Sequence, residues 1–384
     1  MKKIHVMIAI NIIILIGLLT IIINKKNKEY IIQDGIMLAL TLDGEKIKSY
    51  PEGTNYGVDV DCENGKGKWL VEEWKLSIEE VTGNVICNID FKTNPKTLKS
   101  EVEEVNKNNN YNGHGYRYSG KHPNNYIWFN NEVWRIIGSI PTCLEASCGT
   151  NTTNLVKIIR ENTIGGYSYD AISSGYTGAW GSNTLYNLLN THYYSTNLEG
   201  LNGQSHAGCY GYYLSNKYYT ILSKNNCDYT NIGILSSTYY GKMVENVYWN
   251  TGATSPWGTV TDAYSSEITK RTVNGYVGLI NVSDYGYAAS SQFHSTTMTN
   301  YSSNTTGNYG ILEITKTNWL YDFLNLWSIN QNVESASESI FIYGVLSHEA
   351  TFNGRNVRPV VYLDSEVYIV SGDGTQSNPY QIGM

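Results

Sequence analysis

The sequence predicts an α+β fold. Short segments that alternate apolar with polar residues outnumber segments with helical spacing, and long stretches rich in Gly, Ser, Asn and Tyr separate them. No internal repeat points to a solenoid or a propeller. With 384 residues, the chain is long enough for two or three domains. We expect four parts: an anchor (residues 1–29), a small β domain (30–95), a short helix with an Asn-rich linker (96–115) and a large α+β domain with long loops (116–384).

The N-terminal segment predicts a membrane anchor. Residues 6–23 are apolar except at Asn11, Gly17 and Thr20. At a rise of 1.5 Å per residue such a helix is about 27 Å long, close to the thickness of a bilayer core. A Lys- and Asn-rich segment follows where a cleavage site would contain small residues. This favours an uncleaved signal anchor over a removed signal peptide. Lysines flank both ends, so charge does not decide the orientation.

The six cysteines predict disulfide bonds. They show no CxxC motif and no spacing to histidine that is typical of zinc sites. Taken in order they form three local pairs, and unpaired structural thiols are the alternative. Disulfides would place most of the chain outside the cytosol. The expected pairs are Cys62–Cys87, Cys143–Cys148 and Cys209–Cys227.

The small domain is expected to consist of strands. An Asp43-Gly44 turn predicts a hairpin, and alternating segments that carry Cys62 and Cys87 predict two half-buried strands. A core of this size needs a covalent link between such strands. Thr97–Val105 then predicts a short helix before the Asn-rich linker.

The large domain opens with a predicted hairpin, Tyr126 to Gly138. Asn tolerates positive φ, so Asn130-Asn131 suits a two-residue turn. Both faces of the hairpin would then be apolar and covered, with Trp128 and Trp134 as core residues. The register pairs Phe129 with Glu132, Trp128 with Val133, Ile127 with Trp134 and Tyr126 with Arg135.

Further elements follow from the spacing of apolar residues along the large domain. Arg358, beside the last predicted strand, is expected to pair with a carboxylate in a structural role. The predicted elements are a buried strand at 155–160, a short helix at 182–190, a second helix at 236–250, a strand followed by a turn at 275–288, and a closing strand at 357–363.

Four phrases of this domain resemble a module of bacterial surface proteins, in the same order and over roughly residues 116–382. A small β unit like that of residues 34–92 often precedes that module. The resemblance extends to C-type-lectin-like and formylglycine-enzyme-like folds, where the first and last strands pair and long loops carry the ligand site. It implies that the strand at 357–363 joins the opening hairpin. The phrases are "YRYSGKHPNNYIWFNNEVWRIIG", "VKIIRENTIGGYSYD", "GLINVSDYGYA" and "VRPVVYLDSEVYIVSGDGTQSNPY".

The chain departs from both relatives. Asn250 ends the helix predicted at 236–250, so we do not expect it to bind calcium as the corresponding lectin strand does. No cysteine follows Cys227, which argues against the oxidation chemistry of formylglycine enzymes.

The sequence contains no recognised catalytic, cofactor-binding or metal-binding motif, and its seven histidines are scattered. We therefore expect no cofactor and no metal. One polar cluster beside the closing strand is the candidate ligand-binding site, and a solvated loop is the alternative. It comprises His348, Glu349, Asn353 and Arg355.

Charge narrows the class of partner. Residues 30–384 keep 22 of the 27 basic and 33 of the 34 acidic residues, a formal charge of −11. This argues against nucleic acid as a partner. Loops rich in Tyr, Ser, Gly and Asn suit adaptable recognition. We expect a cell-surface binding protein, held in the cell membrane by its N-terminal helix, whose ligand is a glycan or a surface protein. A cell-envelope hydrolase and a purely structural surface protein are the alternatives, and catalysis is the less favoured.

Overall fold

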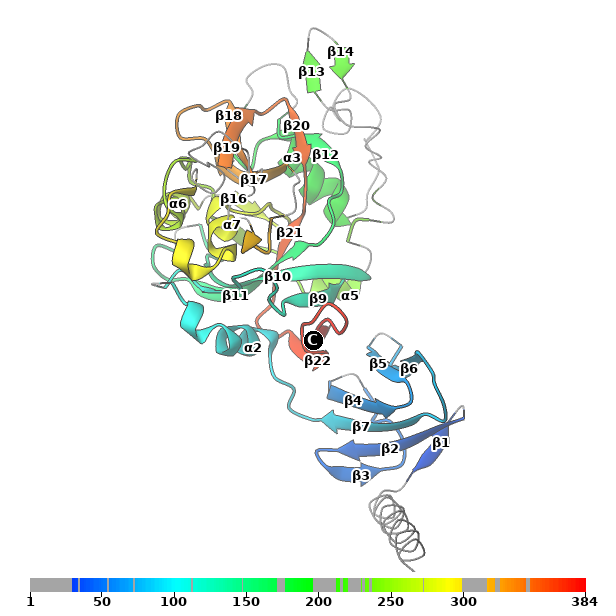
Figure 1. Cartoon of the computed structure of the whole chain (residues 1–384). Helices are drawn as coiled ribbons and strands as arrows, with labels where there is room; N and C mark the ends of the chain where they lie inside the picture. The colour runs from blue at the N-terminus through cyan, green and yellow to red at the C-terminus, as the bar shows by residue number, and fades with distance from the viewer. Residues whose placement is uncertain are drawn as a thin grey trace, which may run out of the picture. The chain divides into compact units, whose positions relative to one another are not determined.

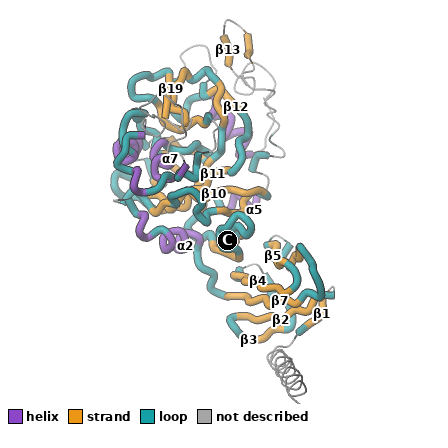
Figure 2. Tube along the Cα trace, viewed as in Figure 1, coloured by secondary structure: helices purple, strands orange, loops and turns teal. Residues whose placement is uncertain are grey.

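The computed structural model describes residues 30–384 with gaps, and it divides into one unit that ends at Pro95 and another that begins at Lys96. Strands and loops dominate both, with few helices (Figures 1 and 2), so the α+β prediction is confirmed. The gaps are residues 34, 54, 72, 112, 147, 171–176, 196–211, 215–216, 220–228, 230–231, 235–236, 272, 299–315, 322–324 and 343–345.

The small unit is built on a mixed sheet. Its strand order is β1-β2-β7-β4, with β3 paired to β2, and β2 runs parallel to β7. A separate hairpin joins β5 to β6. The strands are β1 (Ile31–Gln33), β2 (Ile36–Leu42), β3 (Glu45–Ile47), β4 (Gly57–Glu63), β5 (Lys66–Leu70), β6 (Lys75–Glu79) and β7 (Ile86–Lys92).

An aromatic core fills this unit. Trp69 is 1% exposed and meets Phe91 and Trp74 edge to face, with ring centroids 5.3 Å and 5.2 Å away. Leu40 and Ile89, on the parallel strands, are also buried. Such edge-to-face pairs are a favoured geometry for aromatic rings.

Two predictions for this unit are confirmed. Asp43 and Gly44 have φ of 49° and 83° and form the turn between β2 and β3. Cys62 and Cys87 lie directly opposite each other on β4 and β7 and form a disulfide. The bond therefore joins the two strands across the sheet.

The large unit holds the remaining elements. Its helices are α2 (Leu98–Val105), α3 (Thr184–Asn187), α5 (Ser237–Gly241), α6 (Val260–Glu267) and α7 (Val282–Ala288), with short 3₁₀ turns at Lys107–Asn109 and Ser291–Phe293 and a π-helical segment at Leu188–Tyr193. Its strands are β8 (Tyr116–Arg117), β9 (Tyr126–Phe129), β10 (Glu132–Thr142), β11 (Thr153–Arg160), β12 (Gly166–Ser168), β13 (Tyr212–Leu214), β14 (Lys217–Tyr219), β15 (Val247–Trp249), β16 (Val273–Gly275), β17 (Leu326–Gln331), β18 (Glu338–Ile342), β19 (Leu346–Ala350), β20 (Gly354–Asn356), β21 (Val360–Leu363), β22 (Tyr368–Ser371) and β23 (Gln381–Gly383).

The opening hairpin has the predicted register. All four predicted pairs between β9 and β10 are present. Asn130 and Asn131 have φ of 56° and 58°, as a tight two-residue turn requires. The Asn130 amide also donates to the Gly233 carbonyl at 2.7 Å, so the turn is bonded to a distant loop.

The two faces of this hairpin differ in burial. Ile127, Phe129 and Trp134 are 0% exposed on one face, whereas Trp128 and Val133 on the other are half-buried. The prediction of two covered faces is thus right for one face and only partly right for the other. Trp134 is a core residue as expected.

The order of strands around the hairpin corrects one expectation. The sheet runs β21-β11-β10-β8, with β9 on β10, so β11 separates the closing strand β21 from the hairpin. The chain's last residues join the hairpin instead. The Trp128 amide donates to the Tyr380 carbonyl at 2.9 Å, and the Tyr380 amide donates to the Tyr126 carbonyl at 3.0 Å.

A bulge in β10 lets β8 approach closely. The register shifts between Ile136 and Gly138. A Cβ at Gly138 would lie 2.2 Å from the Tyr116 carbonyl oxygen, so only glycine fits there. This bulge fixes the position of Arg117, which belongs to the site described below.

A second sheet, in the order β12-β20-β17-β18-β19, forms another part of the large unit. Trp327 on β17 is 1% exposed, and its indole N–H donates to the Tyr167 carbonyl at 2.8 Å. β19 is an edge strand of this sheet, and it carries two residues of the predicted binding cluster.

The strand at 155–160 and the helix at 182–190 are confirmed by β11 and by α3 with its π-helical continuation. The prediction of one helix over 236–250 is wrong beyond Gly241. Only α5 is helical, and Val247–Trp249 pairs with β16. The apparent helical spacing spanned two elements, since Val247 and Trp249 are buried with the alternation of a strand.

The prediction of a strand followed by a turn over 275–288 is also wrong, because β16 ends at Gly275 and residues 282–288 form helix α7. α7 is buried along its whole length, so its apolar residues show no amphipathic period. Arg358 fulfils its expected structural role. Its Nε donates to the Arg160 carbonyl at 2.6 Å, and Nη2 lies 3.3 Å from Glu161 Oε2.

Residues 96–115, predicted as a helix and a linker, belong to the large unit. The predicted helix is α2, capped by the Thr97 side chain, and Leu98 and Val102 are buried in the core of the large unit. The disulfide Cys143–Cys148 is present as predicted.

Two predictions fall on residues that the structure does not describe, namely the Cys209–Cys227 pair and the anchor in residues 1–29. From residue 30 onward, no described helix combines the length and apolar character needed to cross a bilayer.

Candidate functional site

The four predicted binding residues lie on two strands and the turn between them, not on a loop. His348 and Glu349 are neighbours on β19, where successive side chains point to opposite faces of the sheet. His348 is opposite Ile340 of β18, and Glu349 is opposite Ser339. The structure therefore divides the predicted cluster between the two faces.

On one face, Glu349 gathers the other two residues. Its carboxylate accepts hydrogen bonds from the Asn353 amide and the Arg355 guanidinium. The Arg355 guanidinium lies 4.5 Å from the centre of the Phe341 ring, and its side chain is 20% exposed. Charge pairing and cation–π contact both hold Arg355 against the sheet. Arg355 Nη1 also donates to the Gly354 carbonyl at 2.8 Å, while Arg355 Nε is buried without a hydrogen-bond partner.

On the other face, His348 pairs with a residue that sequence reasoning missed. His348 Nδ1 is 2.8 Å from Glu338 Oε2, and the same oxygen accepts the Asn332 amide at 3.0 Å. The ring of Trp257, just before α6, meets the His348 ring edge to face at 6.5 Å. Glu338 and Trp257 are 10 and 91 positions from His348 in sequence, so no local pattern joined them.

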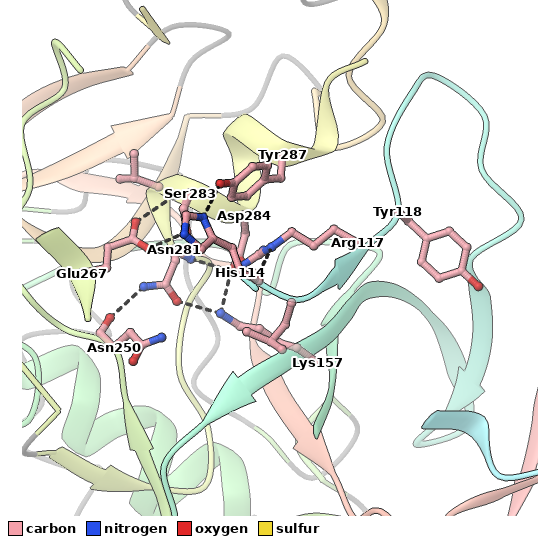
Figure 3. Close-up of polar contacts among 12 residues, drawn as sticks. His114, Arg117, Tyr118, Lys157, Asn250, Glu267, Asn281, Ser283, Asp284 and Tyr287 are labelled. Atoms are coloured by element: carbon pink, nitrogen blue, oxygen red, sulfur yellow. Dashed lines mark hydrogen bonds and ion pairs between the residues drawn. The ribbon is translucent and has the colours of Figure 1, made fainter. Parts of the chain in front are cut away.

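A second polar cluster is fully buried and was not predicted (Figure 3). Asp284 of α7 is at its centre. Arg117 Nη1 of β8 is 2.5 Å from Asp284 Oδ1, and Lys157 Nζ of β11 is 2.6 Å from Asp284 Oδ2. Lys157 also donates to Asn281 at 2.7 Å, and the Asn281 amide donates to the Asn250 carbonyl at 2.7 Å. The cluster thus joins the first sheet to α7.

The charged groups of this cluster shift one another's pKa values. Burial alone would raise the pKa of Asp284, but the Lys157 and Arg117 charges outweigh it and the pKa lies below its ordinary value. For both cations burial opposes the charge, yet the Asp284 carboxylate dominates and their pKa values are raised. All three groups are therefore charged near neutral pH.

Glu267, the last residue of α6, is the other carboxyl group here. Its oxygens accept the Ser283 backbone N–H at 2.8 Å and the Ser283 hydroxyl at 2.5 Å. Burial, assisted by the Asp284 charge, raises the pKa of Glu267 to about 7, although the Ser283 bonds and Lys157 lower it. Glu267 ties the end of α6 to the start of α7 (Figure 3).

Burial keeps a substrate away from this cluster and so limits the chemistry that it can carry out. Arg117, Lys157, Glu267 and Asp284 are each 0–2% exposed, so a substrate in solution does not reach them. Their bonds join segments far apart in sequence, which is a structural role. One part of this cluster could have been predicted from the sequence. Asn281 followed three residues later by Asp284 is a helix-start pattern, and Asp284 Oδ2 accepts the Asn281 backbone N–H at 3.0 Å.

An aromatic group covers one end of this cluster. The His114 ring stacks on Tyr264 with centroids 4.1 Å apart, and His114 Nδ1 is 2.6 Å from the Tyr287 hydroxyl. Arg117 lies beneath Tyr287, 4.9 Å from its ring centre. Burial and the nearby Arg117 charge lower the pKa of His114.

Asn250 follows a strand, not a helix, so the structural reason for excluding it as a ligand was wrong. Its side-chain oxygen accepts Arg271 Nε at 2.9 Å. Within the described residues, no group of three or more His, Cys, Asp or Glu side chains is arranged to hold a metal ion.

Comparison with family models, with curated proteins and with solved structures finds no match to this chain.

Proposed function

We propose that this protein is a bacterial cell-surface binding protein, anchored in the membrane by residues 1–29 with residues 30–384 outside the cell. The observation that carries the proposal is the pair of disulfides, Cys62–Cys87 and Cys143–Cys148, each closed within one unit. Disulfides persist in oxidising compartments and are rare in the cytosol.

Exposure favours one of the two polar clusters as the binding surface. Glu267 of the buried cluster is 1% exposed and is bonded to Ser283. By contrast, the His348–Glu338 pair is partly exposed, at 33% and 28%, and lies beside Trp257, which is 53% exposed. We therefore place the binding surface on the His348 face of β19.

The finer fold assignment is part of the same proposal. We infer a C-type-lectin-like large unit. Its opening strand β9 bonds to the C-terminal segment at Tyr380, so the beginning and the end of the unit meet. Such closure leaves the intervening segments to carry the ligand surface.

The location is tested by brief protease treatment of intact cells that make the full chain, with thiol labelling in parallel. We expect the protease to release fragments of residues 30–384 and the thiols of Cys62, Cys87, Cys143 and Cys148 to resist labelling. Full protection of the chain together with labelled thiols would overturn the proposal.

Binding is tested with the full-length chain in lipid nanodiscs, added to intact cells and isolated cell envelopes. We expect saturable binding that competes with unlabelled protein. Correct surface location without any saturable binding would instead support a purely structural surface protein.

A further inference from the structure

Trp257 differs from the other tryptophans of the chain. All nine lie in described positions, and eight are buried or half-buried, whereas Trp257 is 53% exposed. Leaving an indole ring exposed forfeits part of the favourable burial of a large apolar side chain. A single exposed apolar residue is common on proteins, so the inference depends on what surrounds this one.

Hydrogen bonds flank Trp257 along the backbone. The Trp257 backbone N–H donates to the Ser255 hydroxyl at 3.2 Å, and the Gly258 carbonyl accepts Met298 N–H at 3.0 Å. Thr259 then caps α6 reciprocally with Asp262. These bonds hold the backbone that carries the ring, which lowers the conformational entropy lost when a ligand stacks on it.

The polar pair beside the ring offers hydrogen-bonding groups. His348 Nδ1 is 2.8 Å from Glu338 Oε2, and His348 Nε2 is an acceptor in the neutral ring and a donor in the charged ring. Both bonds to Glu338 fall on Oε2, and no described residue bonds to Oε1 or Nε2. These two polar atoms thus belong to a pair that lies beside an exposed tryptophan.

We propose that Trp257, His348 and Glu338 form a subsite for a pyranose ring of a neutral oligosaccharide. The inference rests on the proposed binding function and names its ligand class. A pyranose presents C–H bonds on one face, which stack on an indole ring, and hydroxyl groups at its edge, which bond to Nε2 and Oε1. An exposed indole ring beside a polar pair with two available hydrogen-bonding atoms matches both features.

Charge selects neutral sugars over anionic ones. Glu338 belongs to the site, Glu334 is exposed four residues before it, and residues 30–384 carry a formal charge of −11. A uronic acid, a sialic acid or a phosphate polymer would meet like charge here. Glu349 and Arg355 are on the opposite face of the sheet and do not take part.

The test uses the full-length chain in lipid nanodiscs. The probes are immobilised neutral oligosaccharides of glucose, galactose, mannose and N-acetylglucosamine, with polygalacturonate as the anionic comparison. We expect at least one neutral oligosaccharide to bind and polygalacturonate not to bind. Trp257→Ala should weaken the binding by about tenfold or more, and Trp257→Phe should retain part of it. His348→Ala should also weaken it, because one hydrogen-bonding atom is lost.

The matched control is Val333→Ala. Val333 is 58% exposed, and its backbone N–H bonds to the Thr254 carbonyl at 3.0 Å, on the segment that leads to Trp257. This variant should bind like the native chain. Every variant is first checked for an unchanged melting temperature, so that a loss of binding does not reflect unfolding.

Cell envelopes separate this inference from the proposed function. Periodate oxidation of the envelope glycans should abolish saturable binding, and prior protease treatment of the envelopes should not. Binding that resists periodate but is lost after protease, or that Trp257→Ala leaves intact, would overturn the sugar subsite while the binding function stands. Absence of any saturable binding would overturn both.

Discussion

Among single residues, Asp284 links separate parts of the large unit. It is 2% exposed and bonds two buried cations, Arg117 and Lys157, that come from different strands. Breaking a buried ion pair from one side leaves an uncompensated charge, which costs far more than an exposed pair contributes. Here one side chain compensates two charges, so its loss exposes both cations to the full cost of burial.

We therefore predict that Asp284→Asn destabilises the large unit by about 3–5 kcal/mol, because two buried cations lose their anion. Denaturant unfolding followed by tryptophan fluorescence measures the effect. The matched control is Glu104→Gln, the same chemical change in an exposed pair with Lys96, which should leave stability close to native. Equal, small effects of the two changes would show that the cluster contributes little.

At the scale of elements, the contact between α6 and α7 contains a titratable link. Glu267 ends α6 and accepts two hydrogen bonds from Ser283 at the start of α7. Two acidic side chains, those of Glu267 and Asp284, thus lie at the start of α7. Both buried cations, Arg117 and Lys157, bond to Asp284 and not to Glu267. Burial of the group without a direct cation partner is why its pKa is raised.

This link predicts a pH dependence. The folded pKa of Glu267 is about 7, above the ordinary 4.5, so the folded state holds this proton more tightly than the unfolded state. Its contribution to stability is fully present below about pH 4.5 and is lost as pH rises through about 7, a difference of about 3 kcal/mol. Glu267→Gln should remove this slope. Unfolding free energies of both proteins between pH 4 and 8 test it, and parallel curves would contradict it.

At the scale of the whole molecule, the chain is two units with separate cores, each with its own disulfide. Cys62 and Cys87 of the small unit are 25 positions apart, whereas Cys143 and Cys148 of the large unit are five positions apart. In the loop-entropy model a disulfide that closes a longer loop stabilises more. The ratio of these two loop lengths corresponds to a difference in stabilisation of about 1.4 kcal/mol. A small core also depends more on such a link than a large one.

We predict that changing Cys62 and Cys87 together to Ser destabilises residues 30–95 by about 2–4 kcal/mol and leaves residues 96–384 unaffected. Hydrogen exchange read by mass spectrometry resolves the two units. The control changes Cys143 and Cys148 to Ser, which should have a smaller effect, confined to the large unit. Faster exchange in both units after the first change would show that they do not unfold separately.

Features that depend on neighbouring residues could be predicted from the sequence. The Asn130-Asn131 turn and its register, the Asp43-Gly44 turn, the helix after Thr97 and two disulfide pairings all follow from local chemistry or short spacing. The prediction was wrong at 236–250, because that stretch of sequence covers two elements. It was also wrong at 282–288, because a fully buried helix shows no amphipathic period.

Contacts between residues far apart in the sequence depend on the three-dimensional fold. Arg117, Lys157 and Asp284 are up to 167 positions apart and come together because a bulge in β10, strand β11 and helix α7 converge. His348 and Glu349 looked like one cluster, but strand alternation sends them to opposite faces. On its own face His348 meets Glu338 and Trp257, which sheet packing and not sequence distance brings to it.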